Sequence, residues 1–213
     1  MALSDPSAVE ALARELLEAE ELRRPIQAFS ERIDGYTTED GYRIQEALID
    51  LKIAKGRVVI GKKIGFTSER LRRQFGVDEP DYGVLLDECV LSESEPLSVQ
   101  QLIAPRVEAE IAFILQADLD KPCVTAADVC AATAGIMPAI EIVDSRFRDW
   151  RVTVPDTIAD NAANARIVLG GGMRPLADYD LRYIGLTIYK NGHLVDSATG
   201  ANVMGNPIHA VVW

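Results

Sequence analysis

The sequence Arg106-Val107-Glu108-Ala109-Glu110-Ile111-Ala112-Phe113 alternates polar and apolar residues. Because successive side chains of a β-strand point to opposite faces, this pattern predicts a strand with Glu108 and Glu110 on one face and the apolar side chains, from Val107 to Leu115, turned towards a core. Residues two apart on a strand stand about 6.5 Å apart at their Cα atoms. Both carboxylates can therefore reach one cation, although a strand face in water would show the same alternation.

A third glutamate, Glu141, lies in the apolar run Ala139-Ile140-Glu141-Ile142. Burying an ionised carboxylate there is costly unless a positive partner meets it. Three carboxylates suit Mg²⁺ or Mn²⁺ better than zinc, which prefers histidine and cysteine. The three glutamates are therefore candidate metal ligands.

The composition narrows the class of protein. The chain has 213 residues, 48% of them hydrophobic and 26% charged, and a net charge of −11, which is typical of a globular protein and disfavours a nucleic-acid-binding surface. No signal peptide or membrane span is recognisable, so a cytoplasmic location is expected. The three cysteines lack C-x-x-C spacing and are interpreted as reduced, mostly core thiols. With only two histidines, a Ser-His-Asp or Cys-His site is not supported.

Periodicity and capping signals predict an α+β fold that begins with two helices. The first follows Asp5-Pro6 and ends by Pro25, and the second begins after Thr37 and ends at Gly56. Further helices are expected over residues 68–75 and 125–134 and after Asn206-Pro207. The predicted strands are Val58–Phe66, Val107–Leu115, Pro138–Val143, Arg166–Leu169 and a hairpin of Ile184–Lys190 with His193–Ser197 around Asn191-Gly192.

Lys63 is a second chemical candidate, because Gly61 and Gly65 share its strand face and leave space beside its amine. An ammonium there can hold a carboxylate or exchange a proton with a substrate. Alternatively, a lysine at the edge of a sheet can simply discourage aggregation through that edge. Residues 79–83 are predicted to form a turn in which Asp81 can be merely structural. Residues 156–161 are predicted to be a polar loop.

Taken together, five motifs resemble the 2-hydroxypenta-2,4-dienoate (2-keto-4-pentenoate) hydratases of the fumarylacetoacetate hydrolase superfamily. The motifs are Gly61-Lys62-Lys63-Ile64-Gly65, Glu79-Pro80-Asp81-Tyr82-Gly83, Pro105-Arg106-Val107-Glu108-Ala109-Glu110, the run from Pro138 to Arg146, and the run from Asp156 to Ala162. The resemblance covers essentially the whole chain in order.

The resemblance implies a mixed β-roll or sandwich that holds Mg²⁺ or Mn²⁺ in its mouth. Glu108, Glu110 and Glu141 match the family's metal ligands, and Lys63 and Asp81 match residues placed at the reacting substrate. Lys63 is the candidate for proton transfer or for steadying the C2 oxygen, and Asp81 for handling water or the distal proton. Arg106 is expected to hold the substrate carboxylate or to neutralise the acids. Asp160 and Asn161 are expected to orient a metal-bound water.

The expected reaction is a lyase reaction: hydration of 2-hydroxypenta-2,4-dienoate, through its 2-oxo-3-enoate tautomer, to 4-hydroxy-2-oxopentanoate in the catabolism of aromatic hydrocarbons. The alternatives are decarboxylation of 2-oxo-3-hexenedioate, hydration of a longer 2-oxo-dienedioate, and a non-catalytic metal-binding fragment. We expect a helical part at residues 1–56 and a catalytic domain at 57–213 that is truncated at its C-terminus. A homo-oligomer, associated with a related decarboxylase, is the expected assembly.

Overall fold

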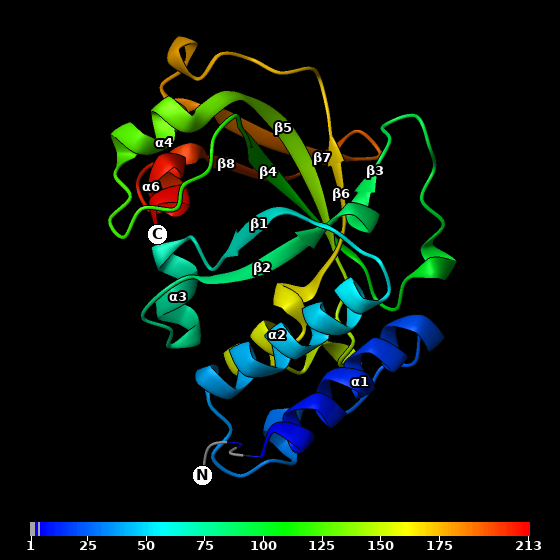
Figure 1. Cartoon of the computed structure of the whole chain (residues 1–213). Coiled ribbons are helices and arrows are strands. Elements are labelled where there is room, and N and C mark those ends of the chain that lie inside the picture. Colours follow the sequence, from blue (N-terminus) through cyan, green and yellow to red (C-terminus); the bar gives the residue numbers. More distant parts are fainter. Residues whose placement is uncertain (1–2, 4) are drawn as a thin grey trace. The chain divides into compact units, whose positions relative to one another are not determined.

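The computed structural model describes residues 3 and 5–213, and its mixture of helices and sheets confirms the α+β class (Figure 1). The α-helices of these residues are α1 (Pro6–Leu22), α2 (Thr38–Ala54), α3 (Glu69–Phe75), α4 (Ala126–Ala132), α5 (Val154–Ala159) and α6 (Pro207–Val212). The strands are β1 (Val59–Gly65), β2 (Asp81–Leu86), β3 (Val90–Leu91), β4 (Arg106–Leu115), β5 (Thr133–Val143), β6 (Asn164–Leu169), β7 (Gly185–Lys190) and β8 (His193–Thr199). The finer arrangement as a roll or sandwich stays a prediction.

The helix ends follow the signals in the sequence. The Asp5 carboxylate accepts a hydrogen bond from the Ser7 amide at the start of α1. Reciprocal bonds between Thr37 and Asp40 open α2 in the manner of a capping box. Helix α1 ends at Arg23, whose φ of 52° is left-handed, two residues before the proline that the sequence suggested as its stop.

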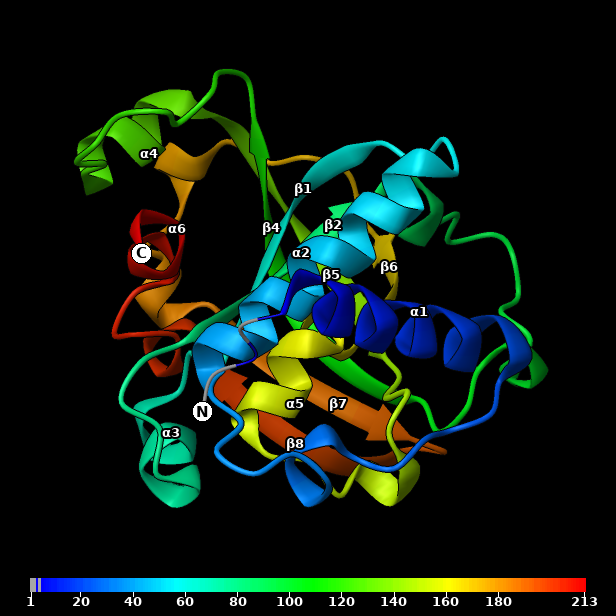
Figure 2. The same cartoon turned by 60° about the horizontal axis from the view of Figure 1, so that its bottom comes forward.

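The described chain divides into two compact units, and the first holds the residues up to Gly65 with Asp81–Glu108 and Glu141–Ile167. In this unit α2 packs against both α1 and α5 (Figure 2). Their shared core includes Phe29 and Phe147, whose ring centres lie 5.0 Å apart in an edge-to-face contact. The predicted boundary between residues 56 and 57 stays a prediction.

Strands β1 and β2 form an antiparallel pair in the first unit, with Lys63 opposite Gly83 and Gly65 opposite Asp81. Residues directly opposite in such a pair share a face. The side chains of Lys63 and Asp81 therefore lie on the same face, each with a glycine across from it.

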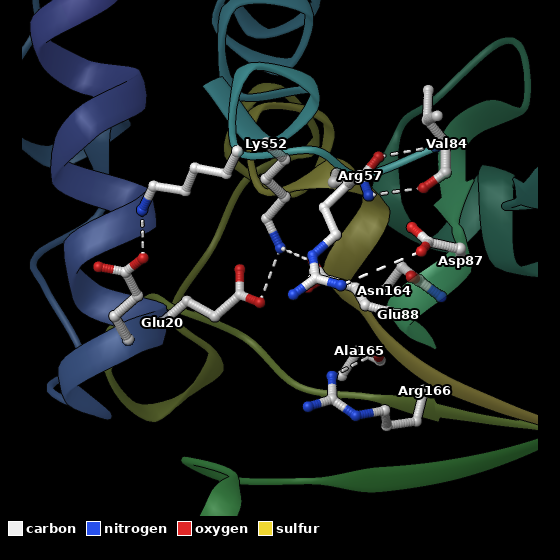
Figure 3. Close-up of polar contacts among 12 residues, drawn as sticks. Glu20, Lys52, Arg57, Val84, Asp87, Glu88, Asn164, Ala165 and Arg166 are labelled. Atoms are coloured by element: carbon white, nitrogen blue, oxygen red, sulfur yellow. Dashed lines mark hydrogen bonds and ion pairs between the residues drawn. The ribbon is translucent and has the colours of Figure 1, made fainter. Parts of the chain in front are cut away.

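An ion-pair network fixes the far end of β2 to the helices (Figure 3). Lys52 of α2 lies 2.8 Å from a Glu20 carboxylate oxygen and 3.1 Å from a Glu88 oxygen. Arg57 lies 2.9 Å from the other Glu88 oxygen. Because Glu88 lies two residues after the end of β2 at Leu86, the network holds that strand at the end opposite to Asp81.

The four-stranded sheet has the order β3-β6-β5-β4. The central strand β5 starts at Thr133, five residues before the predicted strand, because it follows α4 without a loop. Strand β4 runs as predicted, but the expectation that its apolar face turns wholly to a core is wrong at both ends, where Val107 is 59% and Leu115 is 45% exposed.

The second unit comprises Phe66–Pro80, Ala109–Ile140 and Val168–Trp213. It contains α3, which ends at the left-handed Gly76 as predicted, and α4 packed against α6. It also contains the predicted β7–β8 hairpin, with Asn191 and Gly192 at positive φ in its turn. None of the helices in the described chain is both long and apolar enough to cross a bilayer.

Three further sequence-based expectations were wrong. Asp81 begins a strand instead of stabilising a turn, because β1 supplies a partner that local sequence does not reveal. Most of the loop expected at residues 156–161 belongs to α5, which Thr153 and Asp156 cap. The cysteines are free, but Cys123 and Cys130 are exposed and only Cys89 is in the core.

Candidate active site

Three carboxylates converge at the centre of the candidate site. Glu108 and Glu110 lie on β4, and Glu141 lies on the neighbouring strand β5. One ligand oxygen from each of the three glutamates lies within 4.8 Å of the others. Glu141 is buried, whereas Glu108 and Glu110 are exposed. The structure thus brings together the three residues that the sequence selected, and their role as metal ligands stays a prediction.

Both carboxylate oxygens of Glu141 have partners. The Lys63 ammonium lies 3.2 Å from Oε2, and the side-chain amide of Asn164 donates to Oε1 over 3.0 Å. Each carboxylate oxygen has two lone pairs, so these contacts leave acceptor capacity for a further partner. Sequence reasoning missed Asn164, because an asparagine at the start of a strand carries no signal of its own.

Lys63 is enclosed by acidic and carbonyl oxygens. Its ammonium donates to the carbonyl of Ala162 over 2.9 Å and pairs with Glu141. Desolvation lowers the pKa of Lys63, but the negative charges of Glu141, Glu108 and Asp81 outweigh it and raise the pKa above its usual value. The amine is therefore a charged hydrogen-bond donor in this arrangement.

Asp81 is a buried carboxyl group whose two oxygens have no hydrogen-bond partner among the described residues. Burial raises its pKa to about 6; the charge of Lys63 acts in the opposite direction, and Glu141 and Glu108 add to the rise. Its position depends on Gly65, since a Cβ atom there would lie 2.1 Å from Asp81 Oδ1. An unpartnered carboxyl group that titrates near neutrality is suited to proton transfer.

Arg106 and Glu108 lie at the accessible side of the site. The Arg106 guanidinium carbon lies 4.1 Å from the centre of the Trp150 ring, in a cation–π contact. Although Glu108 is accessible to solvent, the protein atoms around it raise its pKa by desolvation. The negative charge of Glu141 also raises this pKa, whereas the positive charge of Lys63 lowers it. The positive charge of Arg106, two residues away on the same strand, also acts to lower the pKa of Glu108.

Asp160 and Asn161 contact other parts of the protein. The Asp160 carboxylate accepts hydrogen bonds from the backbone and guanidinium of Arg146. The Asn161 side chain accepts from the Val84 amide over 2.7 Å and donates to the Val84 carbonyl over 2.9 Å, which Figure 3 shows as two dashed lines at Val84. Their predicted action on a metal-bound water stays a prediction.

Replacing Gly65 with alanine is expected to lower kcat/KM by about 10- to 100-fold, because the added methyl group must displace the Asp81 carboxyl group by about an ångström or more. Steady-state kinetics checks this. Gly61→Ala is the matched control on the same strand face, since its Cβ would meet only Leu85 at 3.7 Å. Equal activity of the two variants would contradict the assigned position of Asp81.

No protein-family model matches the chain. A 2-hydroxypent-2,4-dienoate hydratase of Pseudomonas putida is 40% identical over 210 residues, which cover 98% of this chain and 95% of that protein. A 2-keto-4-pentenoate hydratase of Burkholderia vietnamiensis is 39% identical over 211 residues, covering 99% and 80%.

One solved structure is also similar throughout. The 4-oxalocrotonate decarboxylase from Pseudomonas putida G7, complexed with magnesium and adipate, superposes with a TM-score of 0.94 at 32% sequence identity. The match covers 100% of this chain and 81% of that chain. The chain therefore belongs to the 2-keto-4-pentenoate hydratase family, which confirms the resemblance seen in its motifs.

Proposed function

We propose that this chain hydrates 2-hydroxypenta-2,4-dienoate, through its 2-oxo-3-enoate tautomer, to 4-hydroxy-2-oxopentanoate in the degradation of aromatic compounds by meta-cleavage. The convergence of Glu108, Glu110 and Glu141 beside Lys63 is the observation that carries this proposal. Family membership supports hydration over decarboxylation, because the hydratases compared are 39–40% identical to the chain and the decarboxylase 32%.

The donor set fits a hard divalent cation. Carboxylates whose ligand oxygens lie within 4.8 Å of one another repel each other unless positive charge meets them, and Lys63 and Arg106 supply some of that charge. Oxygen ligands of this kind suit Mg²⁺ and Mn²⁺, and the related decarboxylase is complexed with magnesium. When bound, such an ion supplies Lewis-acid stabilisation of negative charge on a 2-oxo acid. Glu108, Glu110 and Glu141 are the residues that would hold it.

Lys63 is proposed to donate a hydrogen bond to the C2 oxygen of the substrate. Two of its three donor positions are occupied, by Glu141 and by the Ala162 carbonyl. The third is available to a ligand, and a charged amine strengthens such a bond. Because its pKa is raised, Lys63 stays protonated and can stabilise negative charge that develops on the C2 oxygen. For the same reason it is poorly suited to act as a base.

Asp81 is proposed to move the proton in both stages. Its carboxyl group can deliver a proton to the distal carbon of the dienol while the 2-hydroxyl proton leaves to solvent. It can then accept a proton from the water that adds at C4 while C3 takes one from solvent. Its pKa of about 6 places both protonation states within reach near neutrality. Arg106, on the accessible side, is proposed to bind the substrate carboxylate.

Replacing Asp81 with asparagine is expected to flatten the pH dependence of stability between about pH 4 and 6. The folded chain keeps this proton up to a pKa of about 6, whereas the unfolded chain loses it near 3.8. Stability therefore falls as the pH rises through this window and then stays constant. Two pKa units correspond to about 3 kcal/mol, so the variant is expected to gain up to that amount at pH 8 in urea unfolding.

The same variant is expected to lose about 100-fold or more in kcat, because its amide cannot transfer a proton. Asp50→Asn, an exposed aspartate on α2, is the matched control and should change neither quantity. Full activity in the Asp81→Asn variant would contradict the proposed role.

The function itself is tested by following the absorbance of 2-hydroxypenta-2,4-dienoate with and without Mg²⁺, together with analysis of product and CO₂. Loss of substrate with formation of 4-hydroxy-2-oxopentanoate and without CO₂ supports the hydratase. Release of CO₂ from 2-oxo-3-hexenedioate would favour the decarboxylase, and turnover of a longer dienedioate the sister hydratase. Inactivity towards every substrate would favour a metal-binding fragment.

The location and the assembly are further parts of the proposal. We expect a cytoplasmic homo-oligomer that associates with a related decarboxylase. Sedimentation of the chain, alone and mixed with the decarboxylase, would test the assembly.

A further inference from the structure

Residues 161–163 form a turn of left-handed helix directly beside the candidate site. Asn161, Ala162 and Ala163 have φ values of 54°, 49° and 55°. For residues other than glycine this conformation is unfavourable, and it normally occurs at single residues. Three in succession persist only where the surrounding contacts fix them, and such strain often accompanies functional geometry.

The two ends of the turn are held by one buried side chain. Arg146 donates from its guanidinium to the carbonyls of Asp160 and Asn164, the residues that precede and follow the turn. It also binds the Asp160 carboxylate. The turn is therefore clamped from one side by a cation that is 2% exposed.

From this clamped position the segment contacts three strands. The Asn161 side chain bonds to both backbone groups of Val84 on β2. The Ala162 carbonyl accepts from the Lys63 ammonium of β1 over 2.9 Å. The Asn164 amide donates to Glu141 Oε1 of β5 over 3.0 Å. Two residues of this short segment, Ala162 and Asn164, thus hold the two members of the Lys63–Glu141 pair.

We propose that the left-handed turn at residues 161–163 is a positioning element of the active site and that Asn164 is the positioning residue of Glu141. This inference rests on the proposed function, since it assigns Glu141 to a divalent cation. By occupying Oε1, the amide fixes the carboxylate plane and leaves Oε2 directed towards Lys63. Hydrogen bonds that orient a ligand in this way commonly change metal affinity by about 10- to 100-fold when they are removed.

The test is a titration of the full chain with Mn²⁺ alone, followed by the EPR signal of the free ion. Asn164→Leu is expected to weaken Mn²⁺ binding by about 10- to 100-fold, whereas Asn164→Gln, which keeps an amide donor, should recover most of it. If the leucine variant does not fold, Asn164→Ser serves in its place, because its hydroxyl is too short to replace the amide. Circular dichroism and urea unfolding verify that each compared variant is folded.

A second variant tests the turn without touching Asn164. A Cβ atom on Gly83 would lie 2.6 Å from the Asn161 carbonyl oxygen, so Gly83→Ala should displace the turn and weaken Mn²⁺ binding by at least about fivefold, a smaller loss than removal of the amide itself. Gly61→Ala, whose Cβ meets only Leu85, should bind like the wild type.

Unchanged Mn²⁺ affinity in the folded Asn164→Leu or Asn164→Ser variant would overturn the inference, and so would absence of Mn²⁺ binding by the wild type. The two proposals fail separately. A wild-type chain that hydrates the dienoate, with variants that bind Mn²⁺ normally, contradicts the positioning role alone. A wild-type chain that binds Mn²⁺ through this amide but turns over no substrate contradicts the proposed function alone.

Discussion

Replacing Glu108 with glutamine is expected to lower kcat/KM for hydration of 2-hydroxypenta-2,4-dienoate by about 100- to 1,000-fold. Glutamine keeps the shape of the side chain and one oxygen but removes the negative charge that a divalent cation requires. Among the three glutamates, Glu108 offers a clean test because it is exposed, so its replacement should leave the core intact. Steady-state kinetics at several Mg²⁺ concentrations measures the loss.

The kinetic pattern distinguishes a lost ligand from a general defect. Raising the Mg²⁺ concentration should restore part of the activity of the Glu108→Gln variant, since the weakened site can still be filled. Glu93→Gln, an exposed glutamate in a loop of the same unit, is the control and should retain full activity. A Glu108→Gln enzyme with wild-type kinetics at low Mg²⁺ would refute the role of this carboxylate.

Replacing Arg146 with methionine is expected to lower the free energy of unfolding by about 3–5 kcal/mol. The guanidinium donates to the Asp160 carboxylate, to the Asp144 carbonyl over 2.6 Å and to the Asn164 carbonyl over 3.0 Å. Desolvation lowers the pKa of Arg146, but the negative charges of Asp160 and Glu20 outweigh this effect and raise the pKa above its usual value. The side chain therefore stays charged. Methionine would leave the buried Asp160 without its cation.

Urea unfolding of the two proteins measures this loss. Arg148→Met removes a similar side chain from an exposed position two residues away and should change stability by less than about 0.5 kcal/mol. If the free energies of unfolding of the Arg146 variant and the wild type differ by less than about 1 kcal/mol, the hydrogen bonds of Arg146 are not needed for the stability of the fold.

Strand periodicity predicted the central part of this site from sequence. The alternation at residues 106–113 placed Glu108 and Glu110 on one face, and the apolar surroundings of Glu141 indicated that it needs a positive partner. The structure supplies that partner as Lys63, at 3.2 Å from Glu141 Oε2. These inferences worked because both depend on local pattern, which a single sequence contains.

The contacts that sequence reasoning missed depend on distant partners or on unusual backbone. Residues 79–83 were predicted to form a turn, because β1, the strand that pairs with Asp81, lies elsewhere in the sequence. The left-handed φ values at residues 161–163 fall on one asparagine and two alanines, and alanine gives no signal for this conformation. The role of Asn164 follows from that backbone, so it became visible only in the structure.

The most direct test of this account is the stoichiometry and affinity of Mn²⁺ binding in solution. We expect one tightly bound ion per chain and a loss of at least about tenfold in affinity when Glu108, Glu110 or Glu141 is individually replaced by glutamine. Binding that is unchanged in all three variants, or that is absent from the wild-type chain, would contradict it.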